Sequence, residues 1–289
     1  MKSLETRRKL LQTTTVGAAA WLAGGAGVPN PPARAAGQVS RARSQKTGFE
    51  LGVASYTFRQ FHLDQALAMT KRVGLTHICL KSMHLPLEAK PPEITAAAAK
   101  VSGAGLMLDS CGVVYMSSEE QVRQAFDYAK AAGMKTIIGV PSPKLLPLVN
   151  EKVQQYDIRV SIHNHGPGDR TYPVPESAYE KIQDLDKRIG LCIDIGHTFR
   201  YGVDPIASIR KYADRLLDLH IKDVTAPVPD AQEVQVGRGA IDIPEVLRTL
   251  RQVKFAGVAS FEYEAQPADP LPGLAESVGY VRGVLAALG

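Results

Sequence analysis

Cysteine is scarce in this sequence, with three copies among 289 residues. The three are far apart, and each lies in an apolar run typical of a β-strand: Cys79, Cys111 and Cys192. An odd number of widely spaced cysteines excludes the framework of a disulfide-stabilised protein. We therefore expect buried free thiols. The hydrophobic fraction of 45% is ordinary for a globular core.

Two further features are missing. No glycine-rich turn follows the first apolar run, where the sequence reads Ser55-Tyr-Thr-Phe-Arg-Gln60. That turn is the phosphate-binding fingerprint of an open, doubly wound dinucleotide-binding sheet, so its absence disfavours that fold. A long apolar segment is missing as well, because the stretch 15–28 is short and rich in alanine and glycine. This disfavours a membrane-spanning helix.

The N-terminal residues predict an export signal of the twin-arginine type. Arg7 and Arg8 precede the weakly apolar stretch, and Ala33-Arg34-Ala35 supplies small residues for cleavage. A disordered terminus with a chance arginine pair is the alternative. The predicted organisation is a signal peptide over 1–35, a flexible linker over 36–48 and one domain over 49–289. The protein is then expected in the periplasm or outside the cell.

The positive charge of the chain is concentrated in this predicted signal. Five basic residues against Glu5 give it a net charge of +4, out of +5 for the whole chain. The nearly neutral remainder offers no footprint for nucleic acid. No cysteine follows the signal in a position suited to lipid attachment, so we expect no membrane anchor. The sequence allows a homo-oligomer but does not specify the oligomeric state.

The rest of the sequence alternates short β-rich runs with helical patterns eight times. Such alternation indicates a parallel sheet covered by helices, and eight units in about 250 residues are typical of a closed, single-domain (β/α)8 TIM barrel. The expected strands are 51–56, 76–81, 106–114, 135–140, 158–163, 190–195, 216–221 and 257–263. The expected helices are 63–73, 92–104, 117–133, 144–155, 176–187, 205–213, 243–250 and 274–288.

Four successive strands end in residues that can bind a metal. In this fold the C-terminal ends of the strands surround a shared pocket. One candidate ligand comes from each of the last four strands: His163, Asp194, His220 and Glu262. Imidazole and carboxylate ligands together suit one divalent Mn, Zn or Co ion, or Fe, better than Ca.

Each of these residues also has an ordinary structural explanation. A strand-end histidine is often a hydrogen-bonded core residue. Asp194 could cap the turn that follows it, and Glu262 could pair with Lys222 or Arg238. The metal site is favoured because all four residues fall on consecutive strands at the functional end of the barrel.

At these positions the sequence resembles the sugar phosphate isomerase/epimerase family of xylose isomerase-like TIM barrels. The motifs are Asp194-Ile-Gly-His197, His220-Ile-Lys-Asp223, Phe261-Glu262-Tyr-Glu264 and Gly237-Arg-Gly-Ala-Ile-Asp242. The resemblance implies one divalent metal held by a Glu, an Asp, a His and a second Glu. Asp194, His220 and Glu262 match in type, whereas His163 stands in place of the first Glu. A ligating histidine cannot shuttle protons freely, which puts a symmetric two-carboxylate epimerisation in doubt.

We expect a sugar-like substrate to chelate the metal, which polarises its carbonyl before a base removes the neighbouring proton to give a metal-stabilised enediolate. The expected catalytic residues are Glu262, as ligand and base, His165 and Lys222. His165 could instead support a ligand, and Lys222 could orient one. The expected substrate-binding residues are His197, His84, Tyr56 and Arg238, although core packing is an equal alternative for Tyr56. The loop 225–237 is a candidate lid.

A sugar isomerase or epimerase of carbohydrate metabolism is the function expected first. A metal-dependent lyase or hydratase acting on 3-keto-glycosides is the alternative, since it needs only one well-placed base. A non-catalytic sugar-binding barrel is a third. A DNA-repair endonuclease is disfavoured by the small number of histidines, the near-neutral charge and the export signal.

Overall fold

The computed structural model describes residues 48–289. The predicted signal peptide over 1–35 and all but the last residue of the predicted linker lie outside this range. Within the described part, no helix has the length and apolar character needed to span a membrane.

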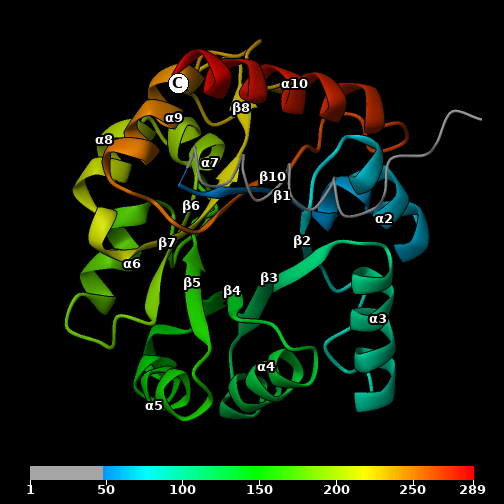
Figure 1. Ribbon diagram of the computed structural model, residues 1–289. Helices are drawn as coiled ribbons and strands as arrows, with labels where there is room; N and C mark the ends of the chain where they lie inside the picture. Colours follow the sequence, from blue (N-terminus) through cyan, green and yellow to red (C-terminus); the bar gives the residue numbers. More distant parts are fainter. Residues whose placement is uncertain (1–47) are drawn as a thin grey trace, which may run out of the picture.

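Eight parallel strands close into a barrel, as the alternating pattern predicts (Figure 1). Around the barrel the strands follow the order β1-β10-β7-β6-β5-β4-β3-β2. The strands are β1 (Glu50–Ala54), β2 (His77–Leu80), β3 (Met107–Met116), β4 (Thr136–Pro141), β5 (Arg159–His163), β6 (Ile189–Asp194), β7 (Leu216–Ile221) and β10 (Val258–Phe261).

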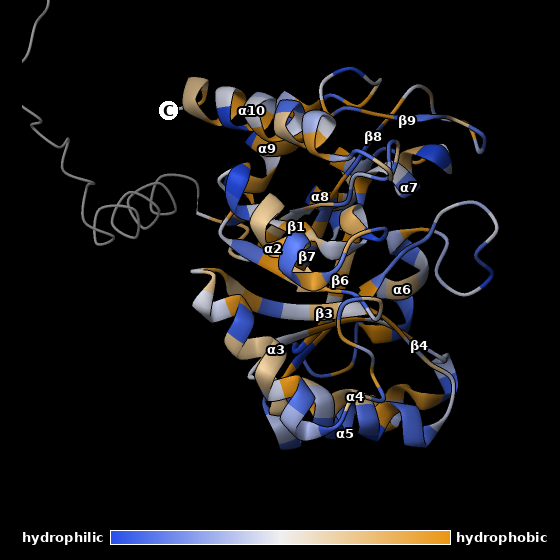
Figure 2. Cartoon of the chain, turned by 90° about the vertical axis from the view of Figure 1, so that its right-hand side faces the viewer, coloured by the Kyte–Doolittle hydropathy of each residue, from blue (hydrophilic) through white to orange (hydrophobic). Residues whose placement is uncertain are grey.

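Helices surround the barrel, and their hydrophobic residues face it. In Figure 2 they carry hydrophilic and hydrophobic residues side by side, and the hydrophobic ones are buried, as in α9. Ser118 caps α4 by accepting a hydrogen bond from the backbone N–H of Gln121. The helices are η1 (Ser55–Phe58), α2 (Leu63–Arg72), α3 (Pro91–Gly103), α4 (Glu119–Ala131), η2 (Pro143–Leu145), α5 (Leu146–Tyr156), α6 (Pro175–Ile182), α7 (Ile195–Arg200), α8 (Pro205–Lys211), η3 (Ala213–Arg215), α9 (Ile243–Gln252) and α10 (Leu271–Ala287).

Two small elements beyond the expected eight units lie near the strand ends. Helix α7 begins directly after β6, where the Asp194 carboxylate accepts the backbone N–H of His197 at 2.8 Å. A hairpin of β8 (Asp223–Val224) and β9 (Glu233–Val234) occupies the expected loop 225–237. Both lie on the same side of the molecule (Figure 2). They are too short to show a hydrophobic period in the sequence.

The register of the strands places the candidate ligands at the same end of the barrel. His163 pairs with Cys192, Asp194 pairs with His220, and His220 pairs with Ser260. Neighbouring ligands are therefore either in register or offset by two residues, and the last four strands deliver them to the same end of the barrel, which is the condition for a shared site.

The opposite end of the barrel is held by a buried arginine. Arg215 lies at the start of β7 and is 1% exposed. Its guanidinium donates hydrogen bonds to four backbone carbonyls of the segment that leads into β6, those of Gln183, Leu185, Asp186 and Ile189. Charge-assisted bonds of this kind are about twice as strong as neutral ones.

The three cysteines are free and buried, as expected. Burial raises the pKa of the Cys79 thiol to about 12, and burial also raises the pKa of Cys111 and Cys192. The thiols are therefore protonated and act as small apolar groups.

Candidate active site

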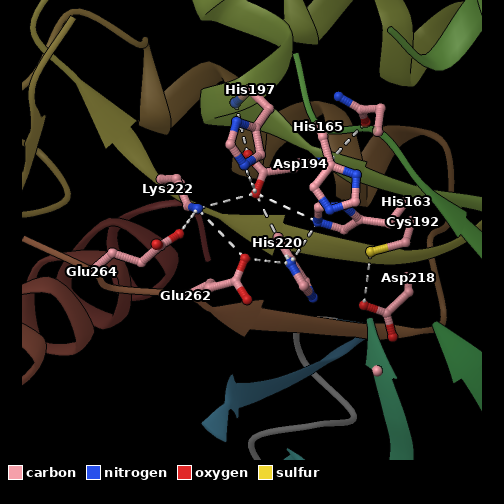
Figure 3. A network of polar contacts seen from close by, with 12 residues as sticks. His163, His165, Cys192, Asp194, His197, Asp218, His220, Lys222, Glu262 and Glu264 are labelled. Atoms are coloured by element: carbon pink, nitrogen blue, oxygen red, sulfur yellow. Dashed lines mark hydrogen bonds and ion pairs between the residues drawn. The ribbon is translucent and has the colours of Figure 1, made fainter. Parts of the chain in front are cut away.

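The four candidate ligands converge at the C-terminal end of the barrel (Figure 3). One nitrogen or carboxylate oxygen from each residue lies within 4.8 Å of the corresponding atoms of the other three, and all four side chains are buried. The set consists of His163 from β5, Asp194 from β6, His220 from β7 and Glu262 just after β10. We refer to it below as the ligand cluster.

The distances within the ligand cluster are short. His163 Nε2 lies 3.0 Å from His220 Nδ1, and His220 Nδ1 lies 3.1 Å from Glu262 Oε2. Asp194 Oδ2 completes the group at 3.7 Å from His163 Nε2. No described residue donates a hydrogen bond to this buried oxygen. The Lys222 ammonium lies 3.5 Å from the same oxygen and offsets part of the cost of its burial, so the convergence of four ligand atoms is what favours a cation at this place.

Electrostatics leave the ligands in the protonation states that a metal requires. Burial lowers the pKa of His163 well below its ordinary value, so its imidazole is neutral. Burial would raise the pKa of Asp194 and Glu262, but nearby positive groups reverse this and hold both well below their usual range. Lys222 has the largest such effect on Asp194, and Lys81 has the largest such effect on Glu262. Both carboxylates are therefore ionised near neutral pH.

Two buried lysines flank the cluster. Lys81 Nζ lies 2.7 Å from Glu262 Oε1. Lys222 Nζ lies 3.4 Å from Glu262 Oε2 and 3.5 Å from Asp194 Oδ2. It also forms an ion pair with Glu264. The pairing of Glu262 with Lys222 that the sequence left open is thus present, within the same cluster as the candidate ligands.

Glycines make room for this arrangement. A Cβ on Gly196 would lie 2.8 Å from the side chain of Lys222. A Cβ on Gly166 would lie 2.7 Å from the carbonyl oxygen of His197, and Gly166 has a φ of +72°. The Gly in Asp194-Ile-Gly-His197 and the Gly after His165 therefore let these segments approach closely.

Hydrogen bonds to the backbone of Asp194 fix its position. Its backbone N–H donates to Asn164 Oδ1 at 3.1 Å, and its carbonyl accepts the hydroxyl of Thr198 at 2.7 Å. Asn164 in turn donates to Thr198 at 3.1 Å. The middle residue of His163-Asn164-His165 thereby links β5 to the start of α7.

A cavity of about 670 Å³ opens above the cluster. This volume lies within the range of about 300–1,000 Å³ that is usual for small-molecule sites. Five of the residues singled out from the sequence line it: Tyr56, His163, His165, His197 and Glu262. The side chain of Lys222 is fully buried beside the ligand cluster.

His84 and Arg238 do not line this cavity. The ring nitrogens of His84 lie 2.9 Å from Ser55 Oγ and 3.0 Å from the Phe61 carbonyl, so both are occupied by the protein. Arg238 forms two hydrogen bonds with Glu276 on α10, instead of pairing with Glu262. Neither side chain has a free polar group at the cavity.

His165 and His197 reach the cavity as neutral rings. Burial lowers the pKa of His165, and burial lowers the pKa of His197 to about 4. His165 Nε2 lies 3.2 Å from the hydroxyl of Tyr115, and Nδ1 lies 3.4 Å from Asp169 Oδ2.

Glu233 is a cavity residue that the sequence did not single out. It belongs to the β8–β9 hairpin, within the expected lid, whose residues from Pro229 to Glu233 line the cavity. Its Oε1 accepts the backbone N–H of Glu264 at 2.6 Å. Burial raises the pKa of Glu233 to about 7. The only available signal was its place in the expected lid, because its burial depends on the hairpin.

Comparisons with known proteins agree with this architecture. The family model described as xylose isomerase-like TIM barrel matches residues 62–284. The structure of the IOLI protein with a bound zinc atom superposes with a TM-score of 0.69 at 18% identity, over 83% of this chain and 99% of that one. At this identity the likeness shows the fold.

Two curated relatives match a smaller part of the chain. Inosose isomerase of Bacillus subtilis (strain 168) is 24% identical over 154 residues, which are 46% of this chain and 55% of that protein. Inosose dehydratase of Clostridium beijerinckii is 26% identical over 129 residues, which are 38% of this chain and 42% of that protein. The chain thus spans about half the length of these relatives. The family match, by contrast, covers most of the chain, and the protein belongs to the xylose isomerase-like TIM barrel family.

Proposed function

We propose that this protein is a metal-dependent isomerase or epimerase of a sugar or a sugar-like polyol. The observation that carries the proposal is the buried ligand cluster, whose four ligand atoms lie within 4.8 Å of one another beside a cavity of about 670 Å³. The similarity to inosose isomerase and inosose dehydratase supports a sugar-like substrate.

The donor set fits one divalent ion of the Mn, Zn or Co type. Two imidazoles and two carboxylates are the ligands that such ions prefer. When bound, the ion would polarise a substrate carbonyl and make the neighbouring C–H more acidic. The zinc in the IOLI structure supports a metal of this kind.

Within this scheme Glu262 holds the metal and is a weak base. Lys81 and His220 engage its two oxygens, and the positive groups around it keep its pKa well below the usual range. A carboxylate that binds protons so weakly is a poor acceptor near neutral pH. Lys222 balances the charge of Glu262 and Asp194.

We assign proton transfer to His165 and Glu233. His165 presents a neutral imidazole to the cavity, and Asp169 orients it. Glu233 has a pKa of about 7 and can therefore give a proton as well as accept one near neutral pH. One group takes the proton from carbon and the other returns it. His197 and Tyr56 remain the proposed contacts for substrate oxygens and the sugar face.

A lyase or hydratase acting on 3-keto-glycosides is the second candidate. The observation that favours it is His163, which leaves β5 without a carboxylate base in the ligand cluster. An elimination needs one base at carbon and one acid for the departing group, and His165 with Glu233 meets that need. A non-catalytic sugar-binding barrel would require neither group.

The test is exchange of substrate C–H hydrogens with deuterated solvent. The metal-loaded and chelator-treated full chain is incubated with aldoses, ketoses, inososes and 3-keto-glycosides, and products are read by NMR and mass spectrometry. We expect metal-dependent exchange that His165→Gln abolishes and the exposed control His62→Gln retains. An isomeric product supports the isomerase, and an unsaturated product supports the lyase. Absence of exchange with every substrate contradicts both and favours a binding protein.

We also propose export of this protein by the twin-arginine route to the periplasm or the medium. The support is the order of Arg7-Arg8, the apolar stretch 15–28 and Ala33-Arg34-Ala35. Cell fractionation should find the protein outside the cytoplasm. Replacing both arginines by lysine should retain it inside, and equal distribution of both forms would refute the route.

A further inference from the structure

A second cavity of about 440 Å³ adjoins the first. It lies over the ends of β3 and β4 and the loop that follows β5. Tyr115 and His165 line both cavities. Their rings stack with centroids 5.7 Å apart and an angle of 21° between the planes. The two cavities therefore meet at this pair.

The lining of the second cavity combines flat apolar faces with free hydroxyls. Pro141, Pro143 and Pro167 contribute ring faces, beside the ring of Tyr115. The hydroxyls belong to Ser117, Ser142 and Thr171, and no described residue hydrogen-bonds their side chains. A pyranose ring has the matching surfaces, because its C–H face packs on flat apolar groups and its edge carries hydroxyls.

Asp169 lies where the two cavities meet. His165 Nδ1 lies 3.4 Å from Asp169 Oδ2, and Asp169 Oδ1 accepts the backbone N–H groups of Thr171 and Tyr172 at 2.7 and 3.1 Å. Asp169 and Thr171 both line the second cavity. The same carboxylate thus lies beside the ring at the junction and holds the loop that bounds the second cavity.

From these observations we infer that the second cavity binds a second sugar ring, so that the substrate is a glycoside of at least two rings. The first ring lies beside the ligand cluster, the second lies between the prolines and Ser142, and the bridging oxygen passes the Tyr115–His165 pair. This inference rests on the proposed function and specifies its substrate class.

Binding of unreactive sugars tests the inference without relying on turnover. Cellobiose, maltose, sophorose and lactose are titrated calorimetrically into the metal-loaded full chain, beside methyl α-glucoside, methyl β-glucoside and methyl β-galactoside. We expect at least one disaccharide to bind about tenfold more tightly than every methyl glycoside. That ratio corresponds to about 1.4 kcal/mol.

Ser142→Tyr is the variant that fills the second cavity. The side chain of Ser142 makes no capping hydrogen bond, and its backbone is extended, so a larger residue is compatible with the fold. We expect the variant to lose the disaccharide advantage and to keep its affinity for the methyl glycosides. Ser102→Tyr, on exposed α3, is the matched control and should retain both. Thr171→Ala, which only removes a hydroxyl, should reduce the advantage by severalfold if Ser142→Tyr unfolds.

The outcomes separate the two proposals. If methyl glycosides bind as tightly as every disaccharide, or if Ser142→Tyr weakens both alike, the second-ring site is refuted and the proposed function stands. If p-nitrophenyl glucosides exceed all disaccharides, the cavity takes an aromatic group and the assignment to a sugar is refuted. If no sugar binds and no C–H exchange occurs, the proposed function fails as well.

Discussion

The charge of Lys222 is expected to stabilise the metal-free protein strongly, and Lys222→Met removes it at nearly constant length. Lys222 is 1% exposed, and its Nζ lies 3.5 Å from Asp194 Oδ2 and 3.4 Å from Glu262 Oε2. At an effective dielectric constant of about 20, each attraction amounts to about 5 kcal/mol. The cost of burying the charges offsets part of this. The variant leaves two buried carboxylates with less compensation, and breaking a buried pair typically costs about 3–5 kcal/mol.

The assay is thermal unfolding in chelator and in excess metal. For a domain of this size about 1 kcal/mol shifts the Tm by roughly 2–4 °C, so the Tm in chelator should fall by about 6–20 °C. A divalent ion supplies the missing positive charge, so Mn²⁺ or Zn²⁺ should recover a larger share of the Tm in the variant than in the parent protein.

Lys100→Met provides the control, because Lys100 pairs with Asp64 on the surface and its side chain is 54% exposed. Its loss should cost less than about 1 kcal/mol. A Lys222→Met protein that melts within 2 °C of the parent in chelator, a tolerance of about 1 kcal/mol, would refute the assigned charge balance. Equal stabilisation of variant and parent by metal would refute the compensation of Lys222 by the ion, and absence of stabilisation in the parent would refute the cation site.

Three other perturbations have defined outcomes. The pKa of Glu233 is about 7 in the folded protein, against an ordinary 4.5, so folding favours its protonated form. Its contribution to stability is therefore full below pH 4.5 and is lost as the pH rises through 7. The Tm of Glu233→Gln minus the Tm of the parent should therefore be higher at pH 8 than at pH 5. A difference that does not change with pH would contradict this. Asn164→Leu should weaken metal affinity by roughly 10- to 100-fold, and Asp194→Asn by more, as measured by competition with a metal indicator. Thiol titration with an aromatic disulfide reagent should find no reactive thiol among the described residues in native protein and three after denaturation, because all three cysteines are buried.

Much of the fold was predictable because it depends on local patterns. Eight alternating units specify the barrel, and because strand ends meet at one end of this fold, they also predict that His163, Asp194, His220 and Glu262 lie together. These positions follow from strand register, which has few alternatives in a closed parallel barrel.

The remaining features depend on tertiary contacts that leave no periodic signal. His84 follows a strand in the sequence, but the chain turns it towards Ser55 and Phe61, which occupy both ring nitrogens. Arg238 lies in a family-like motif, but its guanidinium donates hydrogen bonds to Glu276 on α10. Glu233 acquires its environment only when the β8–β9 hairpin folds over the barrel.

Arg215 has a consequence for how this barrel can be altered. One cation gathers the carbonyls of the turn between α6 and β6 at the end of the barrel remote from the ligand cluster. Rigidity at that remote end is therefore independent of the loops that contact a ligand. Substitutions in the β8–β9 hairpin or in the loop after β5 that retain Asn164, His165 and Glu233 should therefore leave the hydrogen bonds that support β6 and β7 unchanged.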